Sequence, residues 1–225
     1  LGKDYFLQYA PSEIAWQTQG ILPHQPDQLP LVLISAPAKG MTEGGTKVFI
    51  HTRSVDDLFA ATAAAMEQLG LSIHDARIAT SNNNWTLNTF IVLDHQDQAI
   101  SDPERIEEMR RHLVEELDDP DDYPTIVSRH TPRQLKHFKV ATEVLIEQDP
   151  ANERTLLELS APHRPGLLAR VGRIFMEQDI ALSAAKIATL GERVEDVFFI
   201  TTKAGEPLTN PERQQQLLEQ LKRYD

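Results

Sequence analysis

The sequence predicts an α+β fold built from two similar units in tandem, each an antiparallel sheet with helices on one face. Three observations lead to this prediction. The chain is long enough for two units of about 100 residues each. Segments 109 residues apart resemble one another. Each of these segments alternates strand-like and helix-like hydrophobic patterns. An internal repeat of this kind is stronger evidence of architecture than any single motif.

The repeat begins where Ser54 aligns with His163, an offset of 109 residues that becomes 108 after one turn that is a residue shorter. Apolar and turn-forming residues then recur at equivalent places in both copies. The matches pair Leu58 with Leu167, Ala60 with Ala169, Ala76 with Ala185, Ile78 with Ile187, Phe90 with Phe198 and Pro103 with Pro211.

Each copy is expected to run strand, helix, strand, strand, helix. The predicted strands are 46–52, 71–80 and 86–93, then 155–161, 180–189 and 194–202. The predicted helices are about 57–69 and 104–117, then 166–178 and 212–222. In both second strands the apolar alternation changes parity, which predicts a bulge near Asp75 and another near Ala184.

The pattern also predicts the place of a fourth strand. A split βαβ unit closes with a strand beside the first one, but few residues follow the last predicted helix. Each copy is instead preceded by an apolar run, at 31–35 and 138–146. We therefore expect a permuted ferredoxin-like fold, in which a hairpin brings the leading strand into the fourth-strand place. Exchange of these strands between the copies is the alternative.

These elements divide the chain into four segments. Residues 1–30 are a connecting arm with a short helix from Pro11, residues 31–117 the first domain, 118–137 an acidic, proline-broken linker, and 138–225 the second domain. The chain begins with Leu1, so we expect it to be part of a longer protein whose upstream domain leads into the arm.

Composition excludes several functions. The net charge of −12 argues against nucleic-acid and anionic-membrane partners, which need a basic face. The absence of Cys excludes disulfides, thiolate zinc sites and cysteine nucleophiles. No apolar run approaches about 18 residues, and no signal peptide is visible. We expect a cytoplasmic protein without a membrane partner.

No catalytic or metal-binding motif is found. The eight His lack H-E-x-x-H or H-x-H spacing, and neither a G-x-S-x-G elbow nor a nucleotide-binding fingerprint occurs. Asp56 and Asp57 could form a carboxylate pair, but compensation of the helix dipole explains them better. We expect no catalytic residue, no metal and no cofactor in this chain.

The turn at Pro165 and Gly166 is the candidate binding site. A strand that leads through a tight turn into a helix leaves backbone N–H groups free, and such groups suit a carboxylate or another small anion. From the residues alone, a plain strand–helix connection is an equally good interpretation.

A resemblance to known protein families adds to this interpretation. The run Leu157-Glu158-Leu159, followed by residues 164–172, resembles the signature of the ACT domain, a small ferredoxin-like regulatory module. Over nearly its whole length the chain also resembles the C-terminal region of the bifunctional PII uridylyltransferase/uridylyl-removing enzymes of bacterial nitrogen regulation. The stretches that carry this resemblance are Asp4–Leu7, Ile14–Trp16, Leu71–Ala76, Thr89–Leu93, Leu135–Phe138 and Ile187–Asp196.

The resemblance implies two tandem ACT domains that sense glutamine and pair within the chain or in a dimer. They would follow a Mg-dependent nucleotidyltransferase domain and an HD-type hydrolase domain, and their partners would be those catalytic domains and the PII protein. The ligand would lie between two modules, near the strand–helix turn of one and the start of the second strand of the other. The implied residues are His163, Arg164, Pro165, Gly166, Leu167 and Leu168, with Ile180 and Ala181 or their counterparts Leu71 and Ser72.

The chain departs from the ACT pattern in two places. His163 stands where the turn usually carries Asp, and in the first copy Ser54-Val55-Asp56-Asp57 replaces the Pro-Gly turn. The first copy is therefore expected to be a structural partner more than a full binder. The alternative function is an interaction scaffold that contacts PII or the catalytic domains without a ligand of its own.

Overall fold

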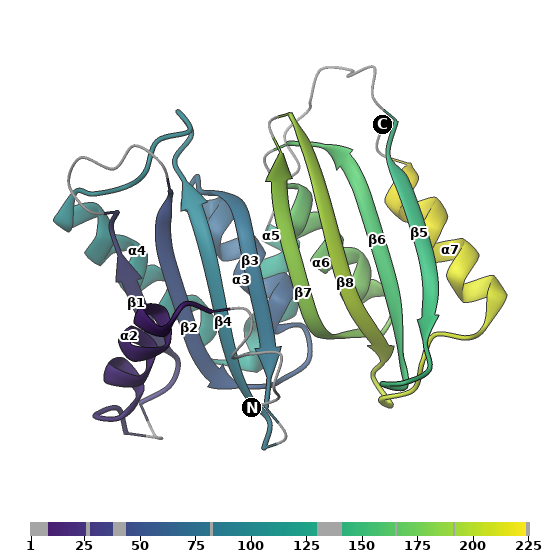
Figure 1. Ribbon diagram of the computed structural model, residues 1–225, viewed down its shortest axis with the longest axis horizontal. Coiled ribbons are helices and arrows are strands. Elements are labelled where there is room, and N and C mark those ends of the chain that lie inside the picture. Colours follow the sequence, from purple (N-terminus) through teal and green to yellow (C-terminus); the bar gives the residue numbers. More distant parts are fainter. Residues whose placement is uncertain are drawn as a thin grey trace.

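The computed structural model describes residues 9–25, 28–37, 44–81, 83–129, 141–164, 166–190 and 192–223. Within them, eight strands form one continuous sheet in the order β1-β2-β4-β3-β7-β8-β6-β5 (Figure 1). All neighbouring strands are antiparallel. We call residues 9–129 the first half and residues 141–223 the second half, and each half contributes four adjacent strands.

The elements agree closely with the sequence pattern, and the α+β fold class is confirmed. The first half contains α2 (Pro11–Ile21), β1 (Leu31–Ser35), β2 (Thr46–Arg53), α3 (Leu58–Gln68), β3 (Ser72–Thr80), β4 (Trp85–Leu93), α4 (Pro103–Leu117), η1 (Pro120–Asp122) and α5 (Tyr123–Arg129). The second half contains β5 (Glu143–Asp149), β6 (Arg154–Pro162), α6 (Leu167–Glu177), β7 (Ile180–Leu190), β8 (Arg193–Thr202) and α7 (Pro211–Lys222).

The leading strand of each half occupies the fourth-strand place. β1 pairs with β2, and β5 pairs with β6, both antiparallel and both within their own half. The permuted ferredoxin-like arrangement is therefore confirmed, and exchange of strands between the copies does not occur. Part of the apolar run expected to form the second leading strand, residues 138–140, lies outside the described residues.

The two halves are related by an approximate twofold axis between β3 and β7. These strands pair antiparallel, with Arg77 opposite Lys186, and the repeat makes these two residues equivalent. The register slips between Ile73 and Asp75 in β3 and between Leu182 and Ala184 in β7. Both predicted bulges are thus present, and they leave His74 and Ser183 as the extra residues.

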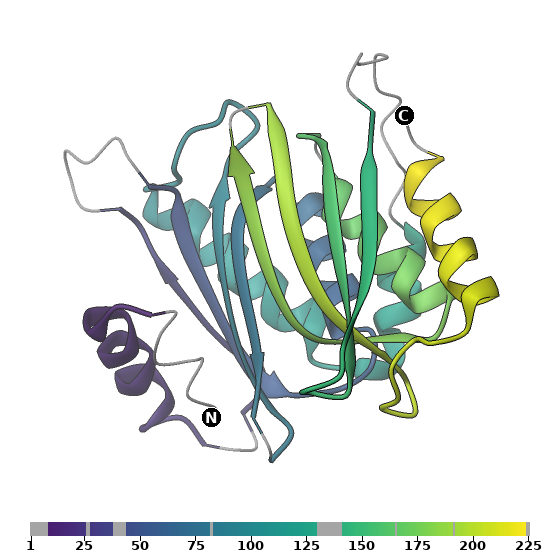
Figure 2. The same ribbon diagram turned by 45° about the vertical axis from the view of Figure 1, so that its right-hand side comes forward.

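Helices α3 to α7 cover one face of the sheet (Figures 1 and 2). Nine of the eleven residues of α3 are buried, from Leu58 to Met66, because this helix lies between the sheet and the neighbouring helices α4, α5 and α6. The crossing of α3 with α6 is close at Gly172, where a Cβ atom would lie 2.6 Å from the Ala60 Cα. The absence of a side chain at Gly172 therefore permits this contact between the two halves.

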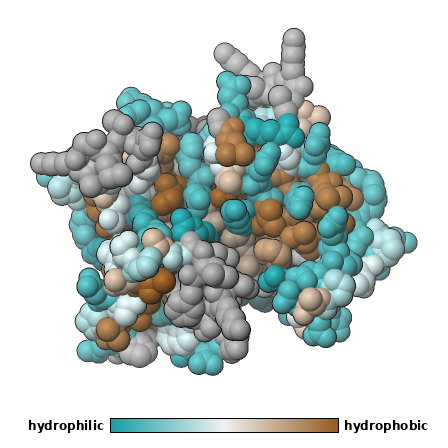
Figure 3. Space-filling view, in the orientation of Figure 1, coloured by the Kyte–Doolittle hydropathy of each residue, from teal (hydrophilic) through white to brown (hydrophobic). Residues whose placement is uncertain are grey.

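Among the described residues, α2 is the only helix on the opposite face, where it lies over β1, β2 and β4 of the first half (Figure 2). Its Ile14, Trp16 and Ile21 pack with Phe49 and Leu87 in a small second core. The equivalent face of the second half has no such cover among the described residues. There hydrophobic side chains gather over β5, β6 and β8 (Figure 3), and Leu145 is 49% exposed.

The segment predicted as a linker, 118–137, is partly structured. η1 lies within the acidic run and α5 begins directly after it, and Tyr123, Ile126 and Val127 are buried in the main core. These apolar side chains recur at helical spacing, which explains why the segment packs and is not solvated throughout. Residues 130–137 lie outside the described part of the chain. No helix in the described ranges is long and apolar enough to span a membrane.

Candidate functional site

The described residues form two cavities between the halves, and the twofold axis relates their walls. In each, one wall is the strand–helix turn of one half, and the other wall is the start of the second strand of the other half. The first cavity lies at the turn before α3 and has a volume of about 250 Å³. The second cavity lies at the turn before α6 and has a volume of about 20 Å³, enough for about one water molecule.

The predicted site residues are divided between the two cavities. His163, Arg164, Gly166, Leu167 and Leu168 line the second cavity together with Leu71 and Ser72. Ile180 and Ala181 line the first cavity, opposite Ser54 to Asp57. Pro165 lies outside the described residues. The turn before α6 is therefore paired with Leu71 and Ser72, while Ile180 and Ala181 face the other turn.

The two turns have the same backbone shape although their sequences differ. Asp57 precedes α3 with φ 63°, and Gly166 precedes α6 with φ 79°, both in the left-handed region. Each turn is also held by one equivalent hydrogen bond: the Ser54 N–H donates to the Asn84 carbonyl, and the His163 N–H donates to the Glu192 carbonyl. Asp57 is therefore an aspartate in a conformation that favours glycine, at a cost of about 1 kcal/mol.

The second cavity is small because Glu67 occupies part of it. The Glu67 carboxylate lies so close to the turn that a Cβ atom on Gly166 would be 2.4 Å from its Oε1. This places a carboxylate of the protein at the N-terminus of α6, the position that an anionic ligand group would prefer. The equivalent residue at the first cavity is Met176, which leaves the N-terminus of α3 without a carboxylate from that position.

The first cavity combines an acidic turn with an amide oxygen that lacks a hydrogen-bond partner among the described residues. Asp57 Oδ2 lies 3.2 Å from Nζ of Lys203 in the other half. Burial lowers the pKa of Lys203, but the bond to Asp57 and the charges of Asp56 and Asp179 outweigh it and raise that pKa. Asn88, only 3% exposed, lines the cavity, and its Oδ1 has no hydrogen-bond partner among the described residues.

The second cavity holds a buried carboxyl group at the place equivalent to Asn88. Asp196 is 1% exposed, and burial raises the pKa of its carboxyl to about 7, although the Ala188 N–H donates to it. At the mouth of this cavity, the Ser72 hydroxyl lies 3.3 Å from His163 Nε2. Burial and the neighbouring His74 lower the pKa of His163, so that its ring is mostly neutral at neutral pH.

Several of these residues were not predicted from the sequence. Asn88, Asp196, Glu67 and Met176 come from strands and helices outside the turn, so no local motif indicates them. The repeat itself contains a signal, because it aligns Asn88 with Asp196 and Glu67 with Met176. At the first of these aligned positions the two copies carry different polar side chains. At the second, a charged side chain in one copy aligns with a methionine in the other. Both positions therefore mark places where the two copies differ in chemistry.

Comparison with known proteins gives relatives of much greater length. The bifunctional uridylyltransferase/uridylyl-removing enzyme of Ectopseudomonas mendocina is 54% identical over 213 residues, which are 94% of this chain and 24% of the relative. The enzymes of the same name from Pseudomonas syringae pv. tomato and Azotobacter vinelandii are 54% identical over 97% and 94% of this chain, again 24% of the relatives. The chain thus spans about a quarter of the length of the curated relatives it matches.

Two other comparisons add little. No family profile matches the chain. Among solved structures, aspartate kinase from Synechocystis overlaps 79% of this chain and 26% of its own, with a TM-score of 0.41 and 13% sequence identity. An overlap this weak leaves the fold assignment to the strand order and register described above.

Proposed function

Given that the chain is homologous to about a quarter of the bifunctional uridylyltransferase/uridylyl-removing enzymes, we propose that it is their regulatory, glutamine-sensing segment. In this proposal the chain has no catalytic residue of its own. Glutamine binding changes the balance between uridylylation and deuridylylation of PII by catalytic domains that lie elsewhere in the longer, cytoplasmic enzyme.

The observation that supports this proposal is the first cavity, which is built from both halves. A ligand bound between Asp57 and Ile180 contacts both halves, so its binding energy favours the arrangement of the halves in which both sets of contacts are made. Catalytic domains attached to the chain would respond to that arrangement. A ligand held by one half alone would have no such effect.

The lining of the first cavity suits an amino acid with an uncharged side chain. Backbone N–H groups at the start of α3, around Leu58 to Ala60, offer donors to the α-carboxylate. Asp56 and Asp57 offer negative charge to the α-ammonium group, and the free Asn88 Oδ1 accepts a hydrogen bond from a side-chain amide. No Lys, Arg or His is among the described residues that line this cavity. A second ligand carboxylate, as in glutamate, would therefore meet no cation in the lining, and the nearby Lys203 is already paired with Asp57.

Calorimetry of the 225-residue chain with glutamine, glutamate and other amino acids tests this proposal. Two matched variants locate the ligand. Ala181→Phe fills the first cavity and should abolish glutamine binding, whereas Ser72→Phe, its equivalent at the second cavity, should leave the affinity within about 2-fold. Asn88→Leu should weaken binding by about 10-fold, since a bond to one amide group contributes about 1–1.5 kcal/mol.

Different outcomes test separately the identity of the ligand, the location of its site and its effect on the catalytic activities. Binding of another amino acid with no glutamine heat would refute the glutamine assignment and keep the regulatory site. Loss of binding in Ser72→Phe, with Ala181→Phe unaffected, would move the site to the second cavity. In the full-length enzyme, Ala181→Phe should remove the glutamine response of both activities while leaving the activities measured without glutamine unchanged.

A second candidate function is an interaction scaffold, and the open sheet face of the second half favours it. Leu145 and Val197 lie on a concave surface over β5, β6 and β8, where the first half has α2. In this case PII or the catalytic domains would cover that face. Replacement of Leu145 by Glu would then weaken regulation in the full-length enzyme without changing any amino-acid affinity of the chain.

A further inference from the structure

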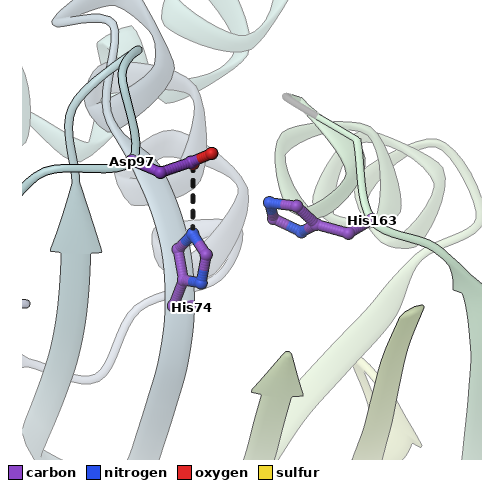
Figure 4. Close-up of side chains that lie close together, drawn as sticks. All are labelled: His74, Asp97 and His163. Carbon is purple, nitrogen blue, oxygen red and sulfur yellow. Dashed lines mark ion pairs between the residues drawn. The ribbon is translucent and has the colours of Figure 1, made fainter. Parts of the chain in front are cut away.

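Three side chains from separate segments converge at the mouth of the second cavity (Figure 4). They are His74 from β3, Asp97 from the loop after β4, and His163 from the turn before α6. One possible ligand atom from each lies within 4.8 Å of the other two. His74 Nε2 is 3.9 Å from Asp97 Oδ1, and the two imidazole rings are 4.8 Å apart between centroids. We call these residues the His-Asp-His cluster.

Two of these residues have an unusual backbone conformation, which directs their side chains toward the cluster. His74 is the extra residue of the β3 bulge, and bulges commonly redirect a side chain near a functional site. Asp97 has φ 56°, a left-handed conformation in which a residue other than glycine is uncommon. Such strain at a non-glycine residue is often found at binding sites.

The other half supplies an internal comparison. The twofold axis places Ser183, Gly205 and Ser54 where the cluster has His74, Asp97 and His163. Gly205 has φ 81°, so both halves have a left-handed residue at this place in the turn. That residue is glycine in the second half and Asp97 in the first. The fold therefore does not require this set of ligand-type side chains, and only one of the two equivalent mouths has it.

Hydrogen bonding within the cluster is incomplete. His74 Nε2 is buried and has no hydrogen-bond partner among the described residues, although it points toward Asp97 (Figure 4). The Asp97 side chain is 78% exposed and is therefore able to move. Among the described residues, the only hydrogen-bond partner of the His163 ring is the Ser72 hydroxyl, 3.3 Å from Nε2, and the contact is long.

We propose that the His-Asp-His cluster binds one divalent transition-metal ion, with zinc as the best match. Two imidazoles and one carboxylate form a common zinc donor set, with bonds of about 2.0–2.2 Å, whereas Mg²⁺ and Ca²⁺ prefer oxygen ligands. Tetrahedral zinc holds neighbouring ligand atoms roughly 3.4 Å apart. The cluster reaches this spacing when the exposed Asp97 carboxylate and the rings close by about 1 Å. A water molecule or the Ser72 hydroxyl completes the coordination.

The ion would join the two halves. His74 and Asp97 belong to the first half and His163 to the second, so coordination connects the β3 bulge to the turn before α6. That connection fixes the walls of the second cavity against each other and restrains the arrangement of the halves. This inference goes beyond glutamine sensing, because it concerns the other cavity and does not require any amino acid to bind.

Titration of the metal-free 225-residue chain with Zn²⁺, and with Co²⁺ as a spectroscopic probe, tests this inference. We expect one saturable site per chain, visible Co²⁺ absorption typical of a tetrahedral or five-coordinate ion, and no saturable signal from Mg²⁺. His74→Gln and His163→Gln should each weaken Zn²⁺ binding by about 100-fold or more, because loss of an outer-shell partner alone costs 10- to 100-fold.

Matched variants keep the test decisive. His95→Gln removes an exposed histidine two residues from Asp97 and should leave the Zn²⁺ affinity unchanged. Asp97→Asn keeps the shape and tolerates the left-handed backbone, so it should fold normally and bind at least about 10-fold more weakly. Circular dichroism checks that each variant is folded. Absence of Zn²⁺ binding, or full affinity in both folded His variants, would overturn the inference.

Discussion

The two cavities share a scaffold but differ in the chemistry of their walls. Both have a left-handed residue at the turn, yet it is Asp57 in one and Gly166 in the other. Met176 at the first cavity corresponds to Glu67 at the second, and Asn88 corresponds to Asp196. The result is a cavity of about 250 Å³ at one turn and a cavity of about 20 Å³ at the other.

This difference shows that the two copies share their backbone structure but differ in the side chains that give each cavity its chemistry. Equivalent hydrogen bonds remain: Thr46 Oγ1 accepts from the Ile100 N–H, and Thr155 Oγ1 accepts from the Leu208 N–H, at 2.7 and 2.8 Å. Residues that hold elements together are thus repeated, while the polar and charged residues that face the cavities have diverged. One cavity remains available to a ligand, and the other is filled by the protein's own charged groups.

The largest expected effect comes from making the second cavity resemble the first with Asp196→Asn. Burial raises the pKa of the Asp196 carboxyl from 3.8 to about 7. A raised acid pKa in the folded protein means that stability is lost as the pH rises from about 4 to about 7. Near pH 8 the buried charge is fully present, so the variant should be more stable by on the order of 3 kcal/mol.

Urea denaturation at several pH values measures this effect. The advantage of Asp196→Asn should shrink as the pH falls and vanish below about pH 4, where wild-type Asp196 is protonated in both states. Glu158→Gln, an exposed carboxylate on β6, is the control and should change stability by less than about 0.5 kcal/mol at every pH. An advantage of Asp196→Asn that does not depend on pH would contradict the explanation.

A smaller effect is expected at the helix crossing that joins the halves. In Gly172→Ala the new Cβ atom would lie 2.6 Å from the Ala60 Cα and 3.0 Å from its Cβ. Both contacts are with the other helix, so α3 and α6 must separate, at a cost of about 2 kcal/mol. Since Gly172 also lines the first cavity, the same change should weaken ligand binding there.

Thermal and urea unfolding of Gly172→Ala would measure the loss. The matched control is Arg173→Ala on the exposed side of α6, which breaks an ion pair with Glu177 at 2.9 Å and should cost about 0.5 kcal/mol or less. If Gly172→Ala were as stable as wild type, the close approach of the two helices would not be needed for the fold.

Substitutions at the two left-handed turn residues, Gly166 and Asp57, should change the free energy of unfolding less than Gly172→Ala does, and by different amounts. Gly166→Ala places a side chain at φ 79° and against the Glu67 carboxylate, at a cost of about 1–2 kcal/mol. Urea denaturation at neutral pH would detect this loss. It should be smaller in the double variant with Glu67→Ala, because the obstructing carboxylate is then absent. Equal losses in the two backgrounds would show that Glu67 is not an obstacle.

The smallest effect is expected for Asp57→Gly in the first turn. Glycine relieves the left-handed strain at φ 63°, but it adds freedom to the unfolded chain and removes the 3.2 Å pair with Lys203. Each contribution is about 1 kcal/mol or less, so the net change in unfolding free energy should stay within about 0.5 kcal/mol. A loss above about 1.5 kcal/mol would mean that the pair with Lys203 holds the halves together.

The strands and helices were predicted well because hydrophobic periodicity can be recognised within each short segment, and the repeat shows the same periodicity in both copies. The bulges near Asp75 and Ala184 follow from a change of parity that is visible in each strand. The contact of α2 with Phe49 was not predicted, because short amphipathic helices carry no signal for the surface they cover. Nor did the acidic start of the linker indicate that Tyr123 would be buried.

The candidate site was predicted only in part. The described turn residues and Leu71, Ser72, Ile180 and Ala181 do line cavities, but which turn faces which strand depends on the β3–β7 pairing. The sequence cannot give cavity size either, since that depends on a side chain such as Glu67 reaching across from the other half. The His-Asp-His cluster joins three segments that lie 23 and 66 residues apart along the chain (97 − 74 and 163 − 97), so no spacing rule detects it.

The β3–β7 pairing has a consequence for how the chain responds to concentration. Modules that pair edge to edge as separate molecules associate only above their dissociation constant. Here both partners lie on one chain, so each experiences an effective concentration of the other in the millimolar range, as expected for a short tether. The inter-half cavities therefore form in every molecule, and their occupancy depends on the amount of ligand and not on the amount of protein.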